Sequence, residues 1–374
     1  HLSESDGVKS GDIKEGGVFN PDFHTKPGYY GKLLQKDGFV LTHYIDGSSW
    51  GTYATQISEE QLFKLTEYNF IEGISEVLNV FPALDNSNAQ ISADYMRADS
   101  YTGFGVTTAI IDDDYDETHG DLPVLDSCYD FQNDDYACNP DDPQSDSHGT
   151  AVSSILLGRG VRNIRYKGVA PGVNSVKFAK VVNSFDVQEA MVWLTDDYLK
   201  PYLVSLSFRA FFTPCGIDEL SRTLDDVVFG EGTVYVVAAG NEGISRITSP
   251  GCAKNAITVG ASYDYDYDNL DSLWDYSSVG PTFDRRKKPD LVAPGCSITY
   301  ADNRNKGYAS GCGTSLATPH VSGAVAKHLQ IFASSRWRPT EVKSLLLATA
   351  LPYLGDISMI GNTYGHGKLE EYPF

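Results

Sequence analysis

The chain has 374 residues, and 41% of them are hydrophobic, which is enough to build one large domain together with a small one. Its net charge of −21 argues against a nucleic-acid partner, because phosphates require a basic protein surface. The sequence has no run of about 18 apolar residues, so we expect no membrane-spanning helix and no membrane partner. The chain begins with His1 and has no apolar leader, which indicates either that a signal peptide has been removed or that the chain was trimmed.

Six cysteines, none in a Cys-x-x-Cys spacing, argue against a zinc or redox motif. An even number in loop-like surroundings fits an oxidising compartment. Acidic residues crowd into 112–146 and 263–275, where their oxygens would suit a hard cation. Neither stretch has the spacing of a defined calcium loop, so the sequence predicts no metal and no other cofactor, with calcium left open.

The first 85 residues divide into two parts. Residues 1–27 are polar and rich in glycine, and we interpret them as a polar tail. Residues 28–85 form a small α+β unit, with strands expected at 38–45 and 50–57, a helix at 58–68 and a strand at 74–80. Turn-forming residues fill 82–90, which predicts an exposed linker, and 86–91 is a candidate cleavage region.

Between residues 92 and 374, short apolar strands alternate with helices. The expected strands are Val106–Ile111, Val176–Val181, Leu203–Phe208, Val234–Ala239 and Ala256–Gly260. The expected helices are His148–Leu157, Val187–Trp193, Ile217–Val228, Thr318–Phe332 and Thr340–Ala348. Uniformly apolar strands separated by helices are typical of an α/β fold with a parallel sheet covered on both faces. In such sheets, chemistry gathers at the carboxyl ends of the strands.

Four polar residues stand at strand ends or helix starts. Asp112 and Asn241 follow apolar strands, whereas His148 and Ser315 stand where a loop passes into an apolar helix. Taken alone, Ser315 would be an ordinary helix cap. With the other three it suits catalysis, because an imidazole takes the serine proton and a carboxylate fixes the imidazole tautomer. The Asn241 amide and the Ser315 N–H would donate to the oxyanion.

The motifs around these residues resemble the subtilisin-like serine proteases, or subtilases, over roughly residues 92–370. They are His148-Gly149-Thr150, Gly313-Thr314-Ser315-Leu316-Ala317-Thr318-Pro319, Lys167–Pro171, Ser277–Pro281 and Lys288–Gly295. The resemblance implies a subtilisin-like catalytic domain at 92–374, with Asp112, His148 and Ser315 as the triad and Asn241 in the oxyanion hole. The implied substrate-binding residues are Ser205, Leu206, Ser207, Phe208, Arg209, Ala238, Ala239 and Gly240.

The resemblance implies a secreted, monomeric endopeptidase that acts on peptides or proteins. With proximity in the sequence, it also favours the disulfides Cys128–Cys138, Cys215–Cys252 and Cys296–Cys312. Residues 38–85 resemble the propeptide of the family, shortened at its start. This implies a zymogen in which the prodomain is an inhibitory partner, with cleavage expected between about Leu84 and Ala93.

Three features depart from the family pattern. Asp114 stands where a glycine is usual, and we expect it in a left-handed conformation. Ser207 and Phe208 replace the two glycines of the usual Ser-Leu-Gly-Gly strand. Either their bulk would crowd the S1 entrance, or the following Arg209 would recognise an acidic or otherwise unusual P1 residue. The calcium loop after the histidine helix is missing. These departures leave open a second hypothesis, a non-catalytic binding protein that kept the fold.

Overall fold

The computed structural model describes residues 84–371 apart from 99, 197–199, 211–214, 244–246, 264–271 and 353–360, and before them only 34, 36, 41–46, 51–55 and 64. The chain divides into two compact units, His1–Val80 and Phe81–Phe374. In the first, β1 (Leu41–Asp46) pairs antiparallel with β2 (Gly51–Thr55), which confirms the predicted hairpin. The predicted tail at 1–27, the helix at 58–68 apart from residue 64, and the strand at 74–80 lie outside the described residues.

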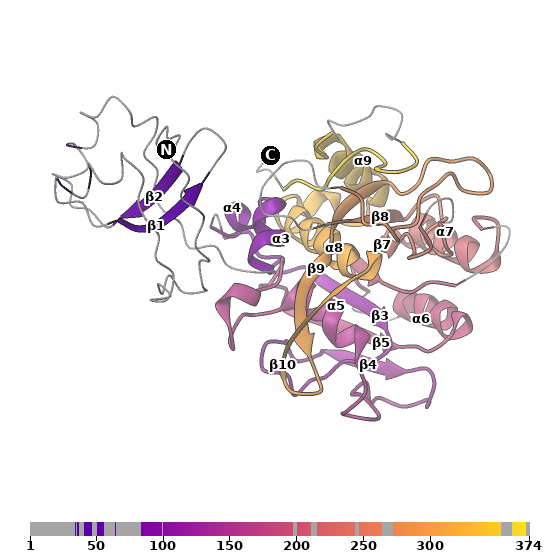
Figure 1. The fold of residues 1–374 in the computed structure, drawn as a ribbon. Coiled ribbons are helices and arrows are strands. Elements are labelled where there is room, and N and C mark those ends of the chain that lie inside the picture. The colour runs from indigo at the N-terminus through magenta and orange to yellow at the C-terminus, as the bar shows by residue number, and fades with distance from the viewer. Residues whose placement is uncertain are drawn as a thin grey trace. The chain divides into compact units, whose positions relative to one another are not determined.

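The second unit is built on an eight-stranded sheet with the order β10-β9-β8-β7-β6-β3-β5-β4 (Figure 1). Its strands are β3 (Thr107–Asp112), β4 (Ser127–Asp130), β5 (Ser175–Lys180), β6 (Leu203–Leu206), β7 (Val234–Ala238), β8 (Ile257–Tyr263), β9 (Leu291–Asp302) and β10 (Gly307–Cys312). Every neighbouring pair is parallel except β9 and β10. This arrangement confirms the predicted α/β class.

Helices cover both faces of the sheet. Side chains alternate between the two faces of each strand, so neighbouring residues of one strand pack in different cores. Ile110 packs in one core with α5 (His148–Leu157), α8 (Thr314–Ile331) and α9 (Pro339–Thr349). Its neighbours Ala109 and Ile111 pack in the other core with α6 (Ser184–Asp196) and α7 (Glu219–Glu231). The strands are therefore buried on both sides, as their uniformly apolar sequences predict.

The predicted elements of this unit are present with small shifts at their ends. Helix α5 has the predicted bounds, and α8 begins at Thr314, four residues before the predicted start. Ser315 is therefore in the first turn of α8, at the boundary between loop and helix where the sequence analysis places it. The run from Gly307 to Gly313 is rich in turn-forming residues, yet most of it is strand β10, which pairs with β9.

The expectation of an exposed linker at 82–90 is wrong for its described part. Residues Leu84–Gln90 form helix α3, in which Ser87 and Asn88 are 0% and 1% exposed. The Ser87 hydroxyl bonds to Nε2 of buried His320 at 2.9 Å, and Asn88 Nδ2 donates to the carbonyl of Lys167. These buried contacts make α3 part of the second unit, so the candidate cleavage region 86–91 is not an exposed strip of chain.

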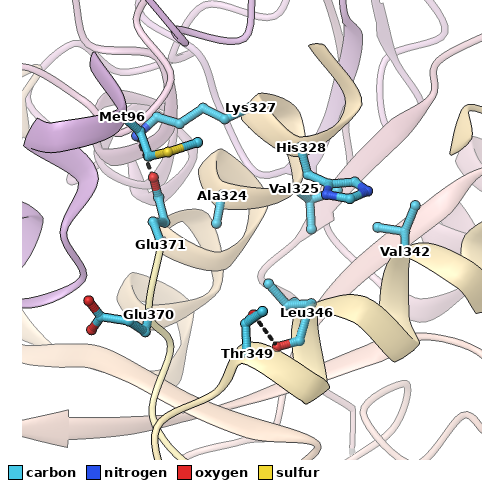
Figure 2. A pocket seen from close by; sticks show the side chains of 10 residues that line it. All are labelled: Met96, Ala324, Val325, Lys327, His328, Val342, Leu346, Thr349, Glu370 and Glu371. Carbon is cyan, nitrogen blue, oxygen red and sulfur yellow. Dashed lines mark hydrogen bonds and ion pairs between the residues drawn. The ribbon is translucent and has the colours of Figure 1, made fainter. Parts of the chain in front are cut away.

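Helix α4 (Ala93–Ala98) is fastened to the same unit by a buried lysine. Lys327 on α8 donates to the carbonyl of Ala93 at 3.1 Å and pairs with Glu371 at 2.6 Å. Figure 2 shows this ion pair beside a small apolar pocket that also includes Met96 and Leu346. The pair therefore joins the start of α4, the middle of α8 and the end of the described chain.

Three disulfides connect loops and strands of the second unit. They join Cys128 to Cys138, Cys215 to Cys252 and Cys296 to Cys312, which confirms the predicted pairing. Among the described helices, none has the length and apolar character needed to cross a membrane.

Candidate active site

A cleft of about 390 Å³ lies at the carboxyl ends of β3, β5 and β7 and at the first turns of α5 and α8. Its lining includes all four residues that the sequence singles out for catalysis. The lining residues are Asp112, Asp113, His148, Val181, Val182, Ser207, Phe208, Arg209, Ala238, Asn241, Thr314 and Ser315. The parallel sheet therefore gathers them at one edge.

Asp112 and His148 form the first polar pair of the cleft. Asp112 is the last residue of β3 and is 5% exposed, and its Oδ1 lies 2.7 Å from His148 Nδ1. The same oxygen accepts the backbone N–H of Asp113 at 2.9 Å. Because the carboxylate bonds to Nδ1, the proton of a neutral imidazole belongs on that nitrogen, and Nε2 is the nitrogen free to exchange a proton.

The backbone around His148 is held by the start of α5. Ser147 is the N-cap, and its side chain accepts the N–H of Thr150. The Asp113 carboxylate accepts the N–H groups of His148 at 3.2 Å and Gly149 at 2.6 Å. A Cβ at Gly149 would lie 2.2 Å from the carbonyl oxygen of Asp114, so only glycine allows this close approach. The end of β3 and the start of α5 are thus locked together.

The carboxylates of the cleft govern its protonation. The His148 side chain is 41% exposed, and its partial burial lowers the pKa of the imidazole. The charge of Asp112 and its hydrogen bond, with the charge of Asp113, outweigh this effect and raise the pKa to about 9. Burial and the charge of Asp112 raise the pKa of Asp113 to about 6, although the N–H of Gly149 opposes this. The imidazole is therefore more basic than an isolated histidine.

Asn241 and Ser315 form a second pair of polar side chains in the lining of the cleft. The side-chain oxygen of Asn241 accepts the backbone N–H of Thr314 at 2.9 Å and the hydroxyl of Thr314 at 2.8 Å. Two donors on one atom fix which end of the amide is oxygen. A methyl group on Gly313 would lie 3.6 Å from Asn241 Nδ2 and 2.9 Å from Ser315 Oγ. The amide N–H₂ group and the hydroxyl thus approach the same point.

The predicted substrate-binding residues fall into two groups. Ser207, Phe208, Arg209 and Ala238 line the cleft. Ser205, Leu206, Ala239 and Gly240 are buried and do not belong to its lining. Four lining residues that sequence reasoning missed are Asp113, Val181, Val182 and Thr314. Each stands directly beside a strand end or a predicted catalytic residue, which is the signal that would have identified them.

Arg209 has a partner within the protein, so its charge is not left free for a ligand. Its guanidinium forms an ion pair with Glu242, the residue after Asn241. The Arg209 side chain is 44% exposed, so water screens this pair. A carboxylate within the protein therefore already compensates the cation at the rim of the cleft.

The expectation that Asp114 adopts a left-handed conformation is wrong, since Asp114 is not among the residues with positive φ. Its carboxylate instead pairs with Lys180 at 3.1 Å. The Lys180 side chain is 2% exposed and also contacts Asp130 at 3.1 Å and Asp141 at 2.9 Å. Burial alone would lower the pKa of Lys180, but these carboxylates hold it above its usual range. The usual glycine is thus replaced by an ion-paired residue.

The acidic stretches supply many carboxylate oxygens that would suit a cation. Among the described residues, however, no group of three or more His, Cys, Asp or Glu side chains is arranged to hold a metal ion.

An α/β sheet that carries a carboxylate, an imidazole, an amide and a serine hydroxyl at the carboxyl ends of its strands defines the class of subtilisin-like serine endopeptidases. Comparison with known proteins agrees, because the model of the subtilase family matches residues 103–367. The chain belongs to the subtilase family.

Individual relatives are 26–30% identical to this chain over the aligned residues. A thermophilic serine proteinase of Bacillus sp. (strain AK1) is 30% identical over 278 residues, which cover 72% of this chain and 61% of that protein. Subtilisin NAT of Bacillus subtilis subsp. natto is 30% identical over 292 residues, which cover 75% and 68%. A solved structure of a cold-adapted subtilisin-like serine proteinase is 26% identical with a TM-score of 0.58, covering 73% and 91%.

Proposed function

We propose that this chain hydrolyses peptide bonds in peptides or proteins as a serine endopeptidase. Ser315 Oγ attacks the substrate carbonyl carbon while His148 Nε2 takes the hydroxyl proton, and Asp112 stabilises the imidazolium that forms. The imidazolium then gives its proton to the leaving amine, which leaves an acyl group on Ser315. Water, activated by the same imidazole, cleaves this ester and regenerates the serine.

The oxyanion formed in both steps would accept hydrogen bonds from Asn241 Nδ2 and the N–H of Ser315. Support comes from the amide of Asn241, whose oxygen accepts from Thr314 while its nitrogen and the Ser315 hydroxyl both lie close to the space beside Gly313. The first turn of the 18-residue helix α8 adds a favourable dipole for negative charge.

The observation that carries this proposal is the 2.7 Å contact between Asp112 Oδ1 and His148 Nδ1 in the cleft that Ser315 also lines. A histidine held in this way is oriented to accept a proton at Nε2. Arg209 and Asp114 are two of the departures from the family pattern that favoured a binding protein without activity. Both side chains have an ion-pair partner within the protein, which gives each a structural role.

We further propose that the protein is a secreted, monomeric zymogen that needs no cofactor for the chemical steps. The three disulfides support an oxidising compartment. The resemblance of residues 38–85 to a propeptide, with its paired strands β1 and β2, supports an inhibitory prodomain that the protease cleaves itself.

Hydrolysis of a peptide library, read by mass spectrometry of the product ends, tests the proposed activity. The chain, incubated until its N-terminal unit is removed, should cut internal peptide bonds, whereas Ser315→Ala should cut none. An equal product yield from both proteins would contradict the proposal. An intact library after incubation with the processed wild type would favour the binding protein instead.

A further inference from the structure

Helix α8 contains a proline, Pro319, four residues after Ser315. In an α-helix, the N–H of residue i+4 donates to the carbonyl of residue i. Proline has no N–H, so the carbonyl of Ser315 lacks its usual partner inside the helix. The carbonyl of Ser315, the residue that carries the hydroxyl, therefore needs a hydrogen-bond donor from outside the helix.

The carbonyls on both sides of Ser315 receive donors from within α8. Thr318 Oγ1 donates to the carbonyl of Thr314 at 2.9 Å, and His320 Nδ1 bonds to the carbonyl of Leu316 at 2.9 Å. The carbonyl of Ser315 instead receives a donor from another element. Ser207 Oγ, just beyond the end of β6, donates to it at 3.0 Å.

Ser207 is well placed for this bond. Its side chain is 9% exposed, and it lines the cleft together with Ser315 although the two residues lie 108 positions apart in the sequence. Ser207 stands where the pattern of the family has glycine, and a glycine has no side-chain donor. The hydroxyl that replaces glycine thus meets the acceptor that Pro319 leaves unpaired.

We propose that Ser207 is a positioning residue for the nucleophile, which rests on the function proposed above for Ser315. By donating to the Ser315 carbonyl, Ser207 fixes the plane of the peptide unit between Ser315 and Leu316. That plane controls how the Cα–Cβ bond of Ser315 is directed. The bond also ties the segment just beyond β6 to the first turn of α8, so we expect the effect to fall on the chemical step rather than on substrate binding.

Ser207→Ala tests this proposal through kcat and KM on a peptide substrate. Loss of one hydrogen bond that orients a reacting group should lower kcat about five- to tenfold and change KM less than about twofold. Ser207→Thr keeps the hydroxyl and should restore most of kcat. Ser322→Ala is the matched control, because Ser322 Oγ donates to Ser205 and ties α8 to β6 further from the nucleophile. It should lower kcat less than about twofold.

Pro319→Ala supplies the missing N–H inside the helix and provides a second test of the role of Ser207. In this background, Ser207→Ala should lower kcat less than it does in the wild type, because the Ser315 carbonyl then has a partner inside the helix. An equal loss in both backgrounds, or a loss confined to KM, would overturn the positioning role.

The carbonyl carbon resonance of Ser315 gives a readout that does not depend on activity. With ¹³C-carbonyl serine and ¹⁵N-leucine labels, it should move upfield in Ser207→Ala and stay in place in Ser207→Thr. An active wild type whose carbonyl does not respond would overturn the positioning role alone. An inactive processed wild type would overturn the peptidase function, and the positioning role with it.

Discussion

The carboxylate of Asp113 accepts the backbone N–H of Gly149 at 2.6 Å, so the residue after Asp112 caps the helix that carries His148. The same carboxylate places a second negative charge beside the imidazole. Burial lowers the pKa of His148, but Asp112 and, to a smaller extent, the charge of Asp113 outweigh burial and raise this pKa to about 9. One side chain therefore combines a structural contact with an electrostatic effect on the base.

Asp113→Asn should move the activity of the enzyme to lower pH. The base must be neutral to accept the serine proton, so kcat/KM of the wild type should rise with pH until the imidazole loses its proton near pH 9. Asparagine keeps an oxygen for the N–H of Gly149 but removes the charge, so the acid limb of the profile should shift downwards. Asp146→Asn should give a smaller shift, because Asp146 contributes least of the three carboxylates. An unshifted limb in Asp113→Asn would contradict this reading.

The ion pair of Asp112 and His148 should also make stability depend on pH. The folded pKa of His148 is raised from 6.5 to about 9, so the stabilisation is fully present below pH 6.5 and is lost as pH rises through about 9. Urea unfolding at several pH values should show this decline in the wild type. The decline should be weaker in His148→Gln, which does not titrate, and equal slopes in both proteins would argue against it.

Removal of the Asn241 donor should reduce catalysis without weakening substrate binding. Loss of one oxyanion donor lowers kcat by about 10²–10³ in this class of enzyme, a range that comes from a subtilisin. Asn241→Asp is the sharper variant, because it keeps the shape of the side chain and the oxygen near Thr314 but has no N–H₂ group. Steady-state kinetics should show a large fall in kcat with KM nearly constant. A fall confined to KM would show that Asn241 binds substrate instead.

Lys180→Met should destabilise the fold. The substitution leaves Asp114, Asp130 and Asp141 without their shared cation, and breaking a buried ion pair costs roughly 3–5 kcal/mol. Lys200→Met is the control, because Lys200 pairs with Glu231 in a more exposed setting, which is worth less than about 1 kcal/mol. Urea unfolding should separate the two variants clearly, and similar midpoints would contradict the prediction.

The N-terminus of a processed chain should not fall within residues 87–93. Cleavage there would cut through α3 or detach it, although Ser87 bonds to buried His320 and Lys327 holds the carbonyl of Ala93. N-terminal sequencing of the processed protein should therefore find an end before Ser87. An end at Ile91 or Ser92 would mean that α3 is released after folding.

The sequence predicted those elements whose own pattern was strong. Strands such as β3 and helices such as α5 have continuous apolar runs or clear caps, and these patterns survive in any packing. Helix α3 could not be predicted in this way, because Asp85, Asn86 and Asn88 favour turns. Contacts with His320 and Lys167, which are distant in the sequence, accompany its helical state.

The sequence indicated the four proposed catalytic residues of the site but not the residues that contact them. His148 and Ser315 belong to motifs of the family, and Asp112 and Asn241 follow apolar strands. All four line one cleft. The partners that hold them were not predictable, because they depend on pairs that only the fold brings together. Lys180 opposite Asp114 and Ser207 opposite Ser315 are two such pairs. Both involve positions where the chain departs from the pattern of its family.

Covalent labelling with a serine-directed phosphonate shows whether Ser315 is a nucleophile activated by His148. If Asp112, His148 and Ser315 act together, the processed wild type should carry one phosphonyl group per chain, and peptide mapping should place it on Ser315. His148→Ala should react far more slowly, since the hydroxyl then has no base. A wild type that stays unlabelled, or one labelled equally well without His148, would contradict the account.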